Sequence, residues 1–411
     1  MYNTFSKALC ALEKVEYALL QKMESGVFQT EKTEDDGVLA QLSRQGFIVD
    51  DCIDELDILK YYHLKARFSN QKMHLTIAPT LACNFACPYC YEKARNGKMS
   101  RETQDALIRY IDRKMEEGIK DVDITWYGGE PLLYPKIVDY LSAEIRAVSE
   151  KHNADLTFSM VTNGYLIDSS IVEMLVRNQI HDIQITIDGL EATHNERRPH
   201  KENANSYQKI ISNLGLFVGS PIRVNIRMNI DRKNYKEYNE LHEIIKSIHQ
   251  SGANIALYPA LVEHLNKDDV ERDDYYMSAK EYEEFLASAY VDRLLADEGL
   301  SVVNNRRYYC SAELNNTFVV DEQGNFYKCW DEIGISQRCC FNVAQPLKIN
   351  YPAMLRFMLD EPFSNPACKE CPFLPLCFGG CKFQKQELKK NGCNFTMKSM
   401  KRYLEQKYFS D

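Results

Sequence analysis

The sequence predicts an α/β fold whose centre is a partial (β/α)6 barrel of the TIM type. Between residues 73 and 265, short runs rich in β-branched residues alternate with amphipathic helical segments. Such alternation predicts parallel strands that are joined by right-handed crossover helices. A small α+β module of residues 1–72 precedes this region, and a cysteine-rich region follows it.

The elements of the central region are predicted from the period of their apolar residues. The strand candidates are residues 75–78, 122–126, 156–161, 183–187, 224–230 and 255–258. The helical segments are residues 101–117, 134–151, 168–178, 207–217 and 235–250. Because function gathers at the carboxyl ends of parallel strands, the residues that follow each strand are the first candidates for a site.

The N-terminal module has a mixed pattern. Residues 8–12 and 46–50 have the composition of short strands, while residues 15–23, 36–44 and 54–66 have helical periodicity.

Charge and cysteine content narrow the class of protein. The 411 residues carry a formal net charge of -9, which argues against a nucleic-acid partner because such partners need a basic surface. No signal peptide is recognised, and no apolar run reaches the roughly 18 residues of a membrane helix. We therefore expect a cytoplasmic protein that does not bind membranes. Ten of its 14 cysteines form two spaced sets that indicate metal binding or catalysis rather than disulfides, and we expect Cys10, Cys52, Cys339 and Cys340 to be buried as small apolar residues.

Three cysteines, Cys83, Cys87 and Cys90, form a CxxxCxxC run directly after the first predicted strand. Cubane iron–sulfur clusters are normally held by four thiolates, so three thiolates leave one iron free for a ligand from outside the protein. Zinc is the alternative, but structural zinc usually has four protein ligands, and no fourth Cys or His lies nearby in the sequence. The pattern favours a cluster with an open iron.

With Tyr89 beside the last of these cysteines, the run resembles the signature of the radical S-adenosylmethionine (SAM) enzymes. The resemblance implies a [4Fe–4S] cluster whose open iron chelates the amino and carboxylate groups of SAM. It also implies that an electron from this cluster cleaves SAM to a 5'-deoxyadenosyl radical.

Polar residues at the ends of the following strands fit SAM contacts of this family. Gly128, Gly129 and Glu130 resemble the GGE motif, which implies binding of the SAM amino group; the alternative is an ordinary strand-to-helix turn. The residues expected to bind SAM are Tyr89, Gly128, Gly129, Glu130, Thr162, Asn163, Thr186, Asp188, Arg197 and Arg198.

Two adjacent arginines, Arg197 and Arg198, both fit the residue that pairs with the SAM carboxylate in similar enzymes. The sequence does not separate them. The alternative for Arg198 is an ion pair with Glu196 or Asp188.

Seven further cysteines form a second spaced pattern, which consists of Cys310, Cys329, Cys368, Cys371, Cys377, Cys381 and Cys393. This pattern resembles the SPASM domain, a module with two auxiliary [4Fe–4S] clusters. A zinc ribbon is the alternative, but seven cysteines do not divide into closed sets of four. A β-hairpin of residues 318–320 and 326–329 is predicted to frame the first cluster. The resemblance assigns Cys310, Cys329 and Cys381 to auxiliary cluster I, and Cys368, Cys371, Cys377 and Cys393 to auxiliary cluster II, which gives three clusters in total.

The sequence leaves the fourth ligand of auxiliary cluster I open. Some SPASM proteins have a further cysteine at the position of Asn304. Either the cluster has an open iron that can bind a substrate thiolate, or another group closes it, with Cys339 and Cys340 the nearest thiols in sequence.

The expected domains are an N-terminal module of residues 1–72, a radical SAM core of residues 73–265, a linker of residues 266–305 and a SPASM domain of residues 306–411. The N-terminal module resembles a shortened winged-helix module, which implies that it holds a leader peptide. The alternative is a structural cap over the open side of the barrel.

Together these resemblances imply a radical SAM oxidoreductase that matures a ribosomally made precursor peptide. Hydrogen abstraction and a Cys-to-carbon thioether are expected, the latter because of the open iron. The alternatives are a formylglycine-generating anaerobic sulfatase-maturating enzyme, a cyclase that forms a carbon–carbon link, and a scaffold without catalysis. An external electron donor such as flavodoxin or ferredoxin is the second expected partner, and the sequence does not identify the proton acceptor.

Overall fold

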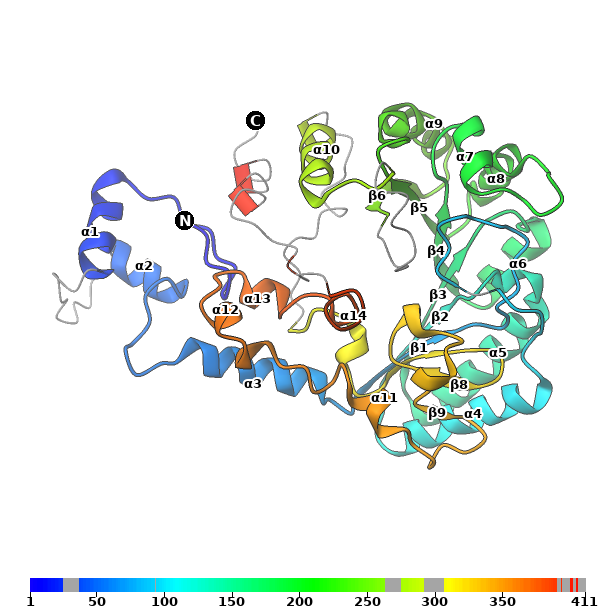
Figure 1. Cartoon of the computed structure of the whole chain (residues 1–411), viewed down its shortest axis with the longest axis horizontal. Coiled ribbons are helices and arrows are strands. Elements are labelled where there is room, and N and C mark those ends of the chain that lie inside the picture. Colours follow the sequence, from blue (N-terminus) through cyan, green and yellow to red (C-terminus); the bar gives the residue numbers. More distant parts are fainter. Residues whose placement is uncertain are drawn as a thin grey trace.

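One mixed sheet organises the chain. The computed structural model describes residues 1–24, 37–92, 94–262, 275–291, 307–389, 393, 400–401 and 404–405. The strand order in the sheet is β6-β5-β4-β3-β2-β1-β7-β8-β9, so the first six strands follow their sequence order (Figure 1). Each neighbouring pair among these six strands is parallel, as a partial barrel requires.

The sheet extends into the cysteine-rich region. β7 pairs in parallel with β1, and the antiparallel strands β8 and β9 follow it. The strands are β1 Lys72–Ile77, β2 Asp121–Trp126, β3 Asp155–Thr162, β4 Ile180–Thr186, β5 Arg223–Ile230, β6 Ile255–Leu261, β7 Thr317–Val320, β8 Asn325–Tyr327 and β9 Phe341–Asn342. The strands of the cysteine-rich region therefore belong to the same sheet as the barrel.

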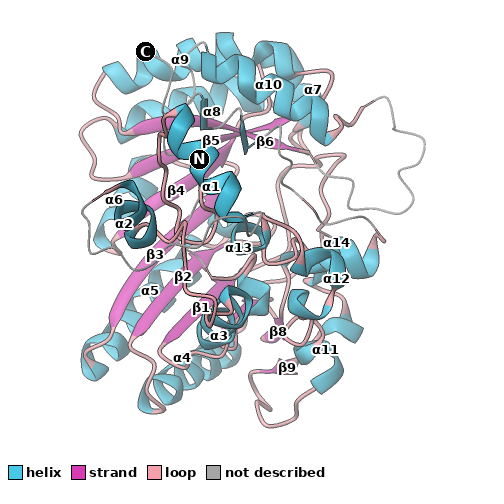
Figure 2. Ribbon diagram, turned by 90° about the vertical axis from the view of Figure 1, so that its left-hand side faces the viewer, coloured by secondary structure: helices cyan, strands magenta, loops and turns pink. Residues whose placement is uncertain are grey.

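Helices cover the outer face of the parallel strands (Figure 2). Those of the barrel are α4 Arg101–Glu116, α5 Pro135–His152, α6 Ser169–Arg177, α7 Glu191–Arg197, α8 Ser206–Leu214 and α9 Tyr238–Gln250. Those outside it are α1 Lys14–Glu24, α2 Val38–Arg44, α3 Glu55–Arg67, α10 Ala279–Val291, α11 Tyr351–Leu355, α12 Pro366–Lys369, α13 Leu374–Cys377 and α14 Lys382–Glu387. Among the described residues, no helix is both long and apolar enough to cross a membrane.

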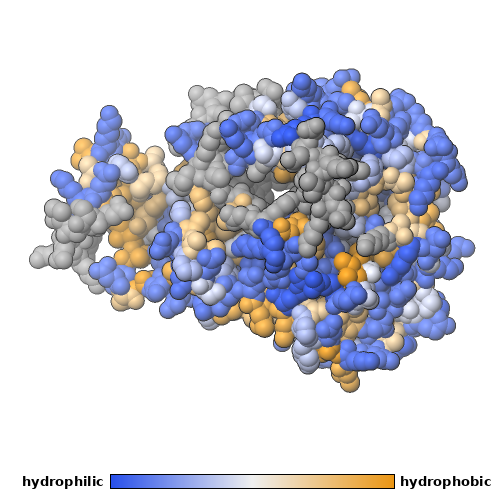
Figure 3. Space-filling view, viewed as in Figure 1, coloured by the Kyte–Doolittle hydropathy of each residue, from blue (hydrophilic) through white to orange (hydrophobic). Residues whose placement is uncertain are grey.

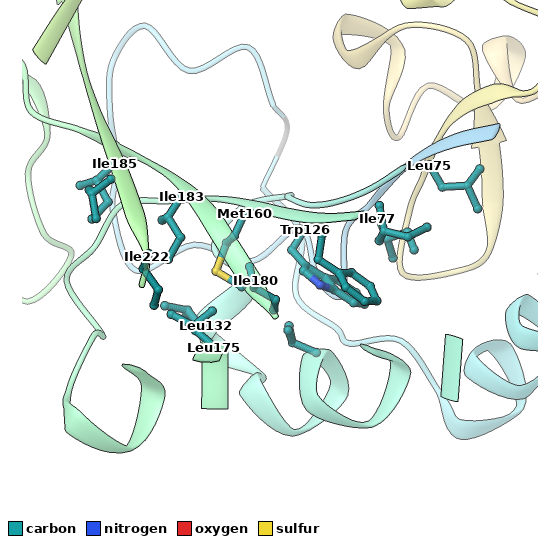
Figure 4. Packing of buried hydrophobic residues seen from close by; sticks show 14 of the residues in the cluster. Leu75, Ile77, Trp126, Leu132, Met160, Leu175, Ile180, Ile183, Ile185 and Ile222 are labelled. Carbon is teal, nitrogen blue, oxygen red and sulfur yellow. The ribbon is translucent and has the colours of Figure 1, made fainter. Parts of the chain in front are cut away.

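The core lies between the strands and these helices. Figure 4 shows Ile77, Trp126, Met160 and Ile183, one from each of four successive strands, packed toward helical residues such as Leu175. All five side chains are almost fully buried. Burial of one large apolar side chain contributes about 1.5–3 kcal/mol to the stability of the fold. This packing fixes the carboxyl ends of the strands, where the polar candidates lie.

The predicted strands and helices of the central region are confirmed, with boundaries that differ by a few residues. The hairpin of β7 and β8 is also confirmed. Helix α7 was not predicted, because its seven residues EATHNER have no apolar period. Part of the expected linker, residues 266–274 and 292–305, lies outside the described residues.

The two strands predicted in the N-terminal module are wrong. Residues 8–12 make a single β-bridge, between Leu9 and Tyr2, and residues 46–50 form no strand. Side chains take the place of a ladder: Asn3 Nδ2 donates to the Gly46 carbonyl at 2.6 Å, and the Ser6 hydroxyl donates to the Gln45 carbonyl at 2.6 Å. The predicted helices 15–23, 36–44 and 54–66 correspond to α1, α2 and α3.

Helix α3 packs on the cysteine-rich region rather than on the barrel strands. Arg67 is buried and donates to the carbonyl of Met358, and the His63 ring stacks on Phe378 with 5.0 Å between ring centroids. Figure 3 shows apolar residues on the surface of the N-terminal helices, where Val15 and Tyr61 are exposed. The described part of the module is therefore helical and docked through α3.

Lowering the pH from 7 to about 4 is expected to weaken the docking of α3. Burial lowers the pKa of His63 from 6.5 to about 4, so the folded chain favours the neutral ring. Between these two values the unfolded chain binds a proton that the folded chain lacks, and the free energy of unfolding falls as pH falls. Thermal unfolding of the wild type, of His63→Gln and of the exposed control His249→Gln checks this. Only His63→Gln should flatten the pH dependence, and an equal effect of both variants contradicts the prediction.

Candidate active site

The CxxxCxxC run lies in the loop between β1 and α4, and its own hydrogen bonds shape it. The Thr80 hydroxyl accepts from the Ala82 N–H at 3.0 Å, and the Cys90 N–H donates to the Cys87 carbonyl at 3.1 Å. The Ala86 N–H donates to the Pro199 carbonyl at 3.0 Å, which ties the loop to the segment after α7. These contacts bring three cysteines to the wall of one cavity of about 820 Å³.

The three thiols fit a metal cluster. Burial raises the pKa of Cys83 to about 12 and of Cys90 to about 11, and it also raises the pKa of Cys87. At neutral pH they are therefore neutral thiols unless a cation lies among them, and the thiolate is the form that binds metal. Among the described residues that line this cavity, there is neither a fourth Cys nor a His, which favours the three-thiolate cluster over a closed zinc site.

Two glycines after β2 let the backbone touch the cysteine loop. A Cβ on Gly128, which has φ +116°, would lie 2.4 Å from the Thr80 carbonyl oxygen, and a Cβ on Gly129 would lie 2.2 Å from the Ala82 carbonyl oxygen. The Gly129 N–H donates to the Thr80 carbonyl at 3.2 Å. The glycines thus allow a close approach of backbone to backbone as well as lining the cavity.

Glu130 lies behind the cavity wall and is fully buried. Its carboxylate accepts from the Leu132 N–H at 3.0 Å, the Thr162 hydroxyl at 2.7 Å and the Asn163 N–H at 2.8 Å. Three of about four acceptor positions of this carboxylate are therefore used by the protein. Burial raises the pKa of Glu130, whereas these hydrogen bonds favour its charged form.

Tyr89 joins the cysteine loop to the end of β4. Its hydroxyl donates to Asp188 and accepts from Arg198 Nη1 at 2.5 Å. Asp188 is buried and also accepts from the Asn229 N–H at 3.1 Å. Of these two residues that were expected to contact SAM, Tyr89 lines the cavity, whereas Asp188 does not line it and holds the Tyr89 hydroxyl.

The two adjacent arginines have different surroundings in the structure. Arg197 pairs with the buried Asp231 and the Tyr275 hydroxyl, and its Nε lies 3.6 Å from Asp188. Arg198 lines the cavity, where its Nη1 donates to the Tyr89 hydroxyl, whereas Arg197 is not among the lining residues. An anion in the cavity can therefore reach Arg198, whereas Arg197 is occupied.

Thr162, Asn163 and Thr186 lie where the strand ends predicted them, on the cavity wall. Asn163 Nδ2 donates to the Asn84 side chain at 2.7 Å, so this residue also supports the cysteine loop.

Several residues of the cavity wall were not predicted from the sequence. Glu92 follows the cysteine run directly, and burial raises the pKa of its carboxyl to about 7. The Tyr91 and Tyr127 hydroxyls share a hydrogen bond, and Trp330 packs on Tyr127 with 4.4 Å between ring centroids. Glu92 could have been predicted from its position next to the cysteine run. Trp330 lies in the cysteine-rich region, and only the pairing of β7 with β1 shows that it belongs to the cavity wall. The other missed residues of the wall include Lys201, Arg227 and Asn229.

The cysteines assigned to auxiliary cluster II gather around Cys377. Burial raises the pKa of its thiol, and Cys371, Cys368 and Cys393 raise it further by their charge. Cys377, in α13, therefore has the other three thiols of this set as neighbours, and four thiolates are the usual ligands of a cubane.

Two of the cysteines assigned to auxiliary cluster I are brought together. Burial raises the pKa of Cys329 strongly, and the neighbouring Cys310 raises it further. Cys381 precedes Lys382, which faces Glu313, and Glu313 in turn accepts from the Cys310 N–H at 3.2 Å. Asn304 lies outside the described residues.

Comparison with known proteins agrees with this arrangement. The sequence model of the Radical SAM superfamily matches residues 77–272, which contain the cysteine loop and the strand ends described above. The chain contains a radical SAM domain. Apart from Trp330, the residues that line the described cavity lie within this domain, and the protein is an enzyme.

Relatives with a named activity align with most of this chain. A cysteine-type anaerobic sulfatase-maturating enzyme of Clostridium novyi is 24% identical over 366 residues, which cover 79% of this chain and 91% of the relative. A serine-type anaerobic sulfatase-maturating enzyme of Klebsiella aerogenes is 22% identical, with 73% and 77% covered.

Solved structures share the fold. Native anSMEcpe with bound AdoMet and Kp18Cys peptide has a TM-score of 0.63 at 20% identity, covering 82% of this chain and 96% of that one. SuiB of Streptococcus suis bound to precursor peptide SuiA has a TM-score of 0.56 at 15% identity, covering 89% and 84%. These likenesses confirm the partial barrel.

Gly129→Ala is expected to distort the cysteine loop and to lower iron incorporation severalfold. The added methyl would meet the Ala82 carbonyl, a backbone atom that cannot turn aside. Gly215→Ala is the matched control, because no atom lies within 4 Å of its added Cβ. Iron analysis of both variants after anaerobic reconstitution checks this, and equal iron content in both contradicts the steric argument.

Glu130→Gln is expected to lower the free energy of unfolding by about 1–3 kcal/mol. Whichever carboxylate oxygen becomes the amide nitrogen, either the Leu132 N–H or the Asn163 N–H loses its acceptor. Urea unfolding measures the effect, with the exposed Glu144→Gln as control. Weaker SAM binding with unchanged stability would instead support direct contact of Glu130 with the SAM ammonium.

Proposed function

We propose that this enzyme is a peptide maturase that binds SAM at the Cys83–Cys90 loop and removes a hydrogen atom from a Cys-containing peptide. The observation that carries the proposal is the single cavity of about 820 Å³, which has the three cysteines on its wall together with Trp330 of the cysteine-rich region. Its volume is within the range of sites for one or two small ligands. A peptide side chain can therefore lie beside SAM and close to the auxiliary clusters.

The residues of the cavity divide the binding of SAM among them. Arg198 is proposed to pair with the SAM carboxylate, because its guanidinium lines the cavity and Tyr89 orients it. The carbonyl groups of Gly128 and Gly129 are proposed to accept from the SAM ammonium, because both glycines line the cavity, and Glu130 holds that turn. When bound at Cys83, Cys87 and Cys90, the cluster supplies the electron that cleaves SAM to the 5'-deoxyadenosyl radical.

Part of the cavity wall is apolar. Phe85, Leu261 and Trp330 lie on it, and the buried carboxylate of Glu92 lies on it beside Tyr91. We propose that the reacting carbon lies against the apolar part, because exclusion of water protects a carbon radical from side reactions.

The proposed product is a Cys-to-carbon thioether, with an iron of auxiliary cluster I binding the peptide thiolate. Three [4Fe–4S] clusters, a precursor peptide and an external reductant such as flavodoxin or ferredoxin complete the proposal, and the enzyme would act in the cytoplasm. The proposed ligands of the auxiliary clusters are the seven cysteines that the sequence assigns to them.

Oxidation of a substrate Cys or Ser to formylglycine is the second candidate. It is supported by the named sulfatase-maturating relatives, one of which spans 79% of this chain. Mass spectrometry of a Cys-containing peptide after turnover separates the two: a thioether loses two hydrogens and keeps its sulfur, whereas formylglycine loses the sulfur.

Replacing Cys83, Cys87 and Cys90 by Ala is expected to abolish cleavage of SAM to 5'-deoxyadenosine. Reconstituted wild type should hold about 12 irons if three cubanes are present, and the triple variant about four fewer. Cys52→Ala is the control, because this exposed thiol lies outside both cysteine sets. Iron analysis and chromatography of the SAM products check the outcome. Cleavage that persists in the triple variant rules out the proposed cluster.

A further inference from the structure

We infer that one side of the cavity, formed by Tyr91, Glu92, Tyr127 and Trp330, binds a basic side chain, Lys or Arg, of the substrate peptide. These four residues are called the Glu92 subsite below. The inference rests on the proposed function, because it takes a peptide as the second ligand of the cavity. It adds a feature of that peptide which the proposed reaction itself does not require.

The charged residues on the cavity wall are separated by the sign of their charge. Among the described residues that line the cavity, the basic ones are Arg198, Lys201 and Arg227, and the one acidic residue is Glu92. Arg198 and Lys201 follow α7, which comes after β4, and Arg227 lies in β5. The basic residues therefore belong to the β4 and β5 side of the barrel, whereas Glu92 lies in the loop after β1.

The strand order places the Glu92 subsite on the β7 side of the cavity. Trp330 follows β8, and Arg95, shortly after Glu92 in the chain, pairs with Asp321 directly after β7 at 2.7 Å. In the sheet, β1, β2 and β3 lie between β7 and β4. Arg198, which is proposed to bind the SAM carboxylate, lies on the β4 side. The β7 side is therefore left for the second ligand.

Glu92 differs from Glu130, the other buried carboxylate of this site, in the use of its oxygens. Glu130 accepts three hydrogen bonds from the protein. Both Glu92 oxygens are shielded from water, and neither accepts a hydrogen bond from a residue that the structure describes. The nearby Tyr127 hydroxyl offsets only part of the rise in the pKa of Glu92 that burial causes. A buried carboxylate without partners is costly, so a ligand that supplies positive charge is favoured there.

Three aromatic rings share this part of the cavity wall with the carboxylate. The Tyr91 and Tyr127 hydroxyls share a hydrogen bond, and Trp330 packs on Tyr127 with 4.4 Å between ring centroids. The faces of Tyr and Trp rings attract cations, and a carboxylate attracts them by its charge. An ammonium or guanidinium group therefore suits the Glu92 subsite better than a neutral side chain, and an acidic side chain would be repelled.

The ammonium group of SAM is the other cation that enters the cavity in the proposed function. It is on the same carbon as the SAM carboxylate, so an ammonium beside Glu92 would draw that carboxylate away from Arg198. The carbonyl groups of Gly128 and Gly129 are already proposed to accept from it. The Glu92 subsite is therefore assigned to the peptide rather than to SAM.

The test uses reconstituted holoenzyme with SAM under anaerobic conditions. Pools of short acetylated peptides carry a Cys within a random mixture of Ala, Gly, Ser and Thr, and one residue near the Cys is Lys, Arg, norleucine or Glu. Equilibrium dialysis followed by mass spectrometry measures the binding of each pool. Wild type, Glu92→Gln and the exposed control Glu144→Gln are compared, and their iron content and SAM affinity are measured as well.

Wild type and Glu144→Gln should bind the Lys and Arg pools about tenfold more tightly than the norleucine pool, and the Glu pool least. Glu92→Gln should lose this preference while its iron content and SAM affinity stay unchanged. The comparison of pools on the wild type needs no substitution, so it tests the inference even if Glu92→Gln fails to fold.

Equal binding of the Lys and norleucine pools to the wild type overturns the inference, and so does a preference that survives in Glu92→Gln. Weaker SAM binding in Glu92→Gln also overturns it, because the carboxylate then belongs to the SAM site. Failure of the proposed function has a different signature: no Cys-containing pool would bind to the wild type, and the inference would fall with it.

Discussion

The contact between the turn after β2 and the cysteine loop after β1 is the constraint on which the site depends. Two backbone segments approach more closely there than any Cβ would permit, and Gly128 and Gly129 make the approach possible. Glu130 then fixes the same turn to the end of β3 through Thr162 and Asn163. Three adjacent strand ends are thereby locked around the loop that carries the cysteines.

Charged side chains are also buried beside this site. Asp188 and Asp231 are fully buried, and Arg197 lies between them with Tyr89 and Tyr275 around it. An isolated buried charge is costly, but paired charges with additional hydrogen bonds are tolerated. Because Arg197 neutralises these carboxylates, Arg198 keeps its positive charge for the cavity.

The sequence predicts the barrel well because its strands and helices have clear apolar periods, as Ile183 and Leu175 show by packing together. It also predicts which strand ends carry the site. It could not predict that the Glu130 carboxylate is used by Leu132, Thr162 and Asn163, because these bonds depend on the exact spacing of β2 and β3.

The wrong N-terminal strands and the unpredicted Trp330 also depend on contacts between residues that are distant in the sequence. The strand predicted at residues 46–50 does not form, and the Gly46 carbonyl accepts from the Asn3 side chain instead of from a neighbouring strand. Residues 8–12 pair with residues 1–3 over too short a stretch to make a strand. Trp330 was missed because its place in the cavity depends on long-range pairing, and single-sequence patterns report only local structure.

The parallel pairing of β7 with β1 has a consequence for how the polypeptide is connected. β1 leads into the loop of Cys83, and the β7–β8 hairpin leads to Cys329, so a hydrogen-bonded ladder sets the separation of the two sites. A substitution that disturbs this ladder would therefore change the separation of the two loops, even though it touched neither set of cysteines.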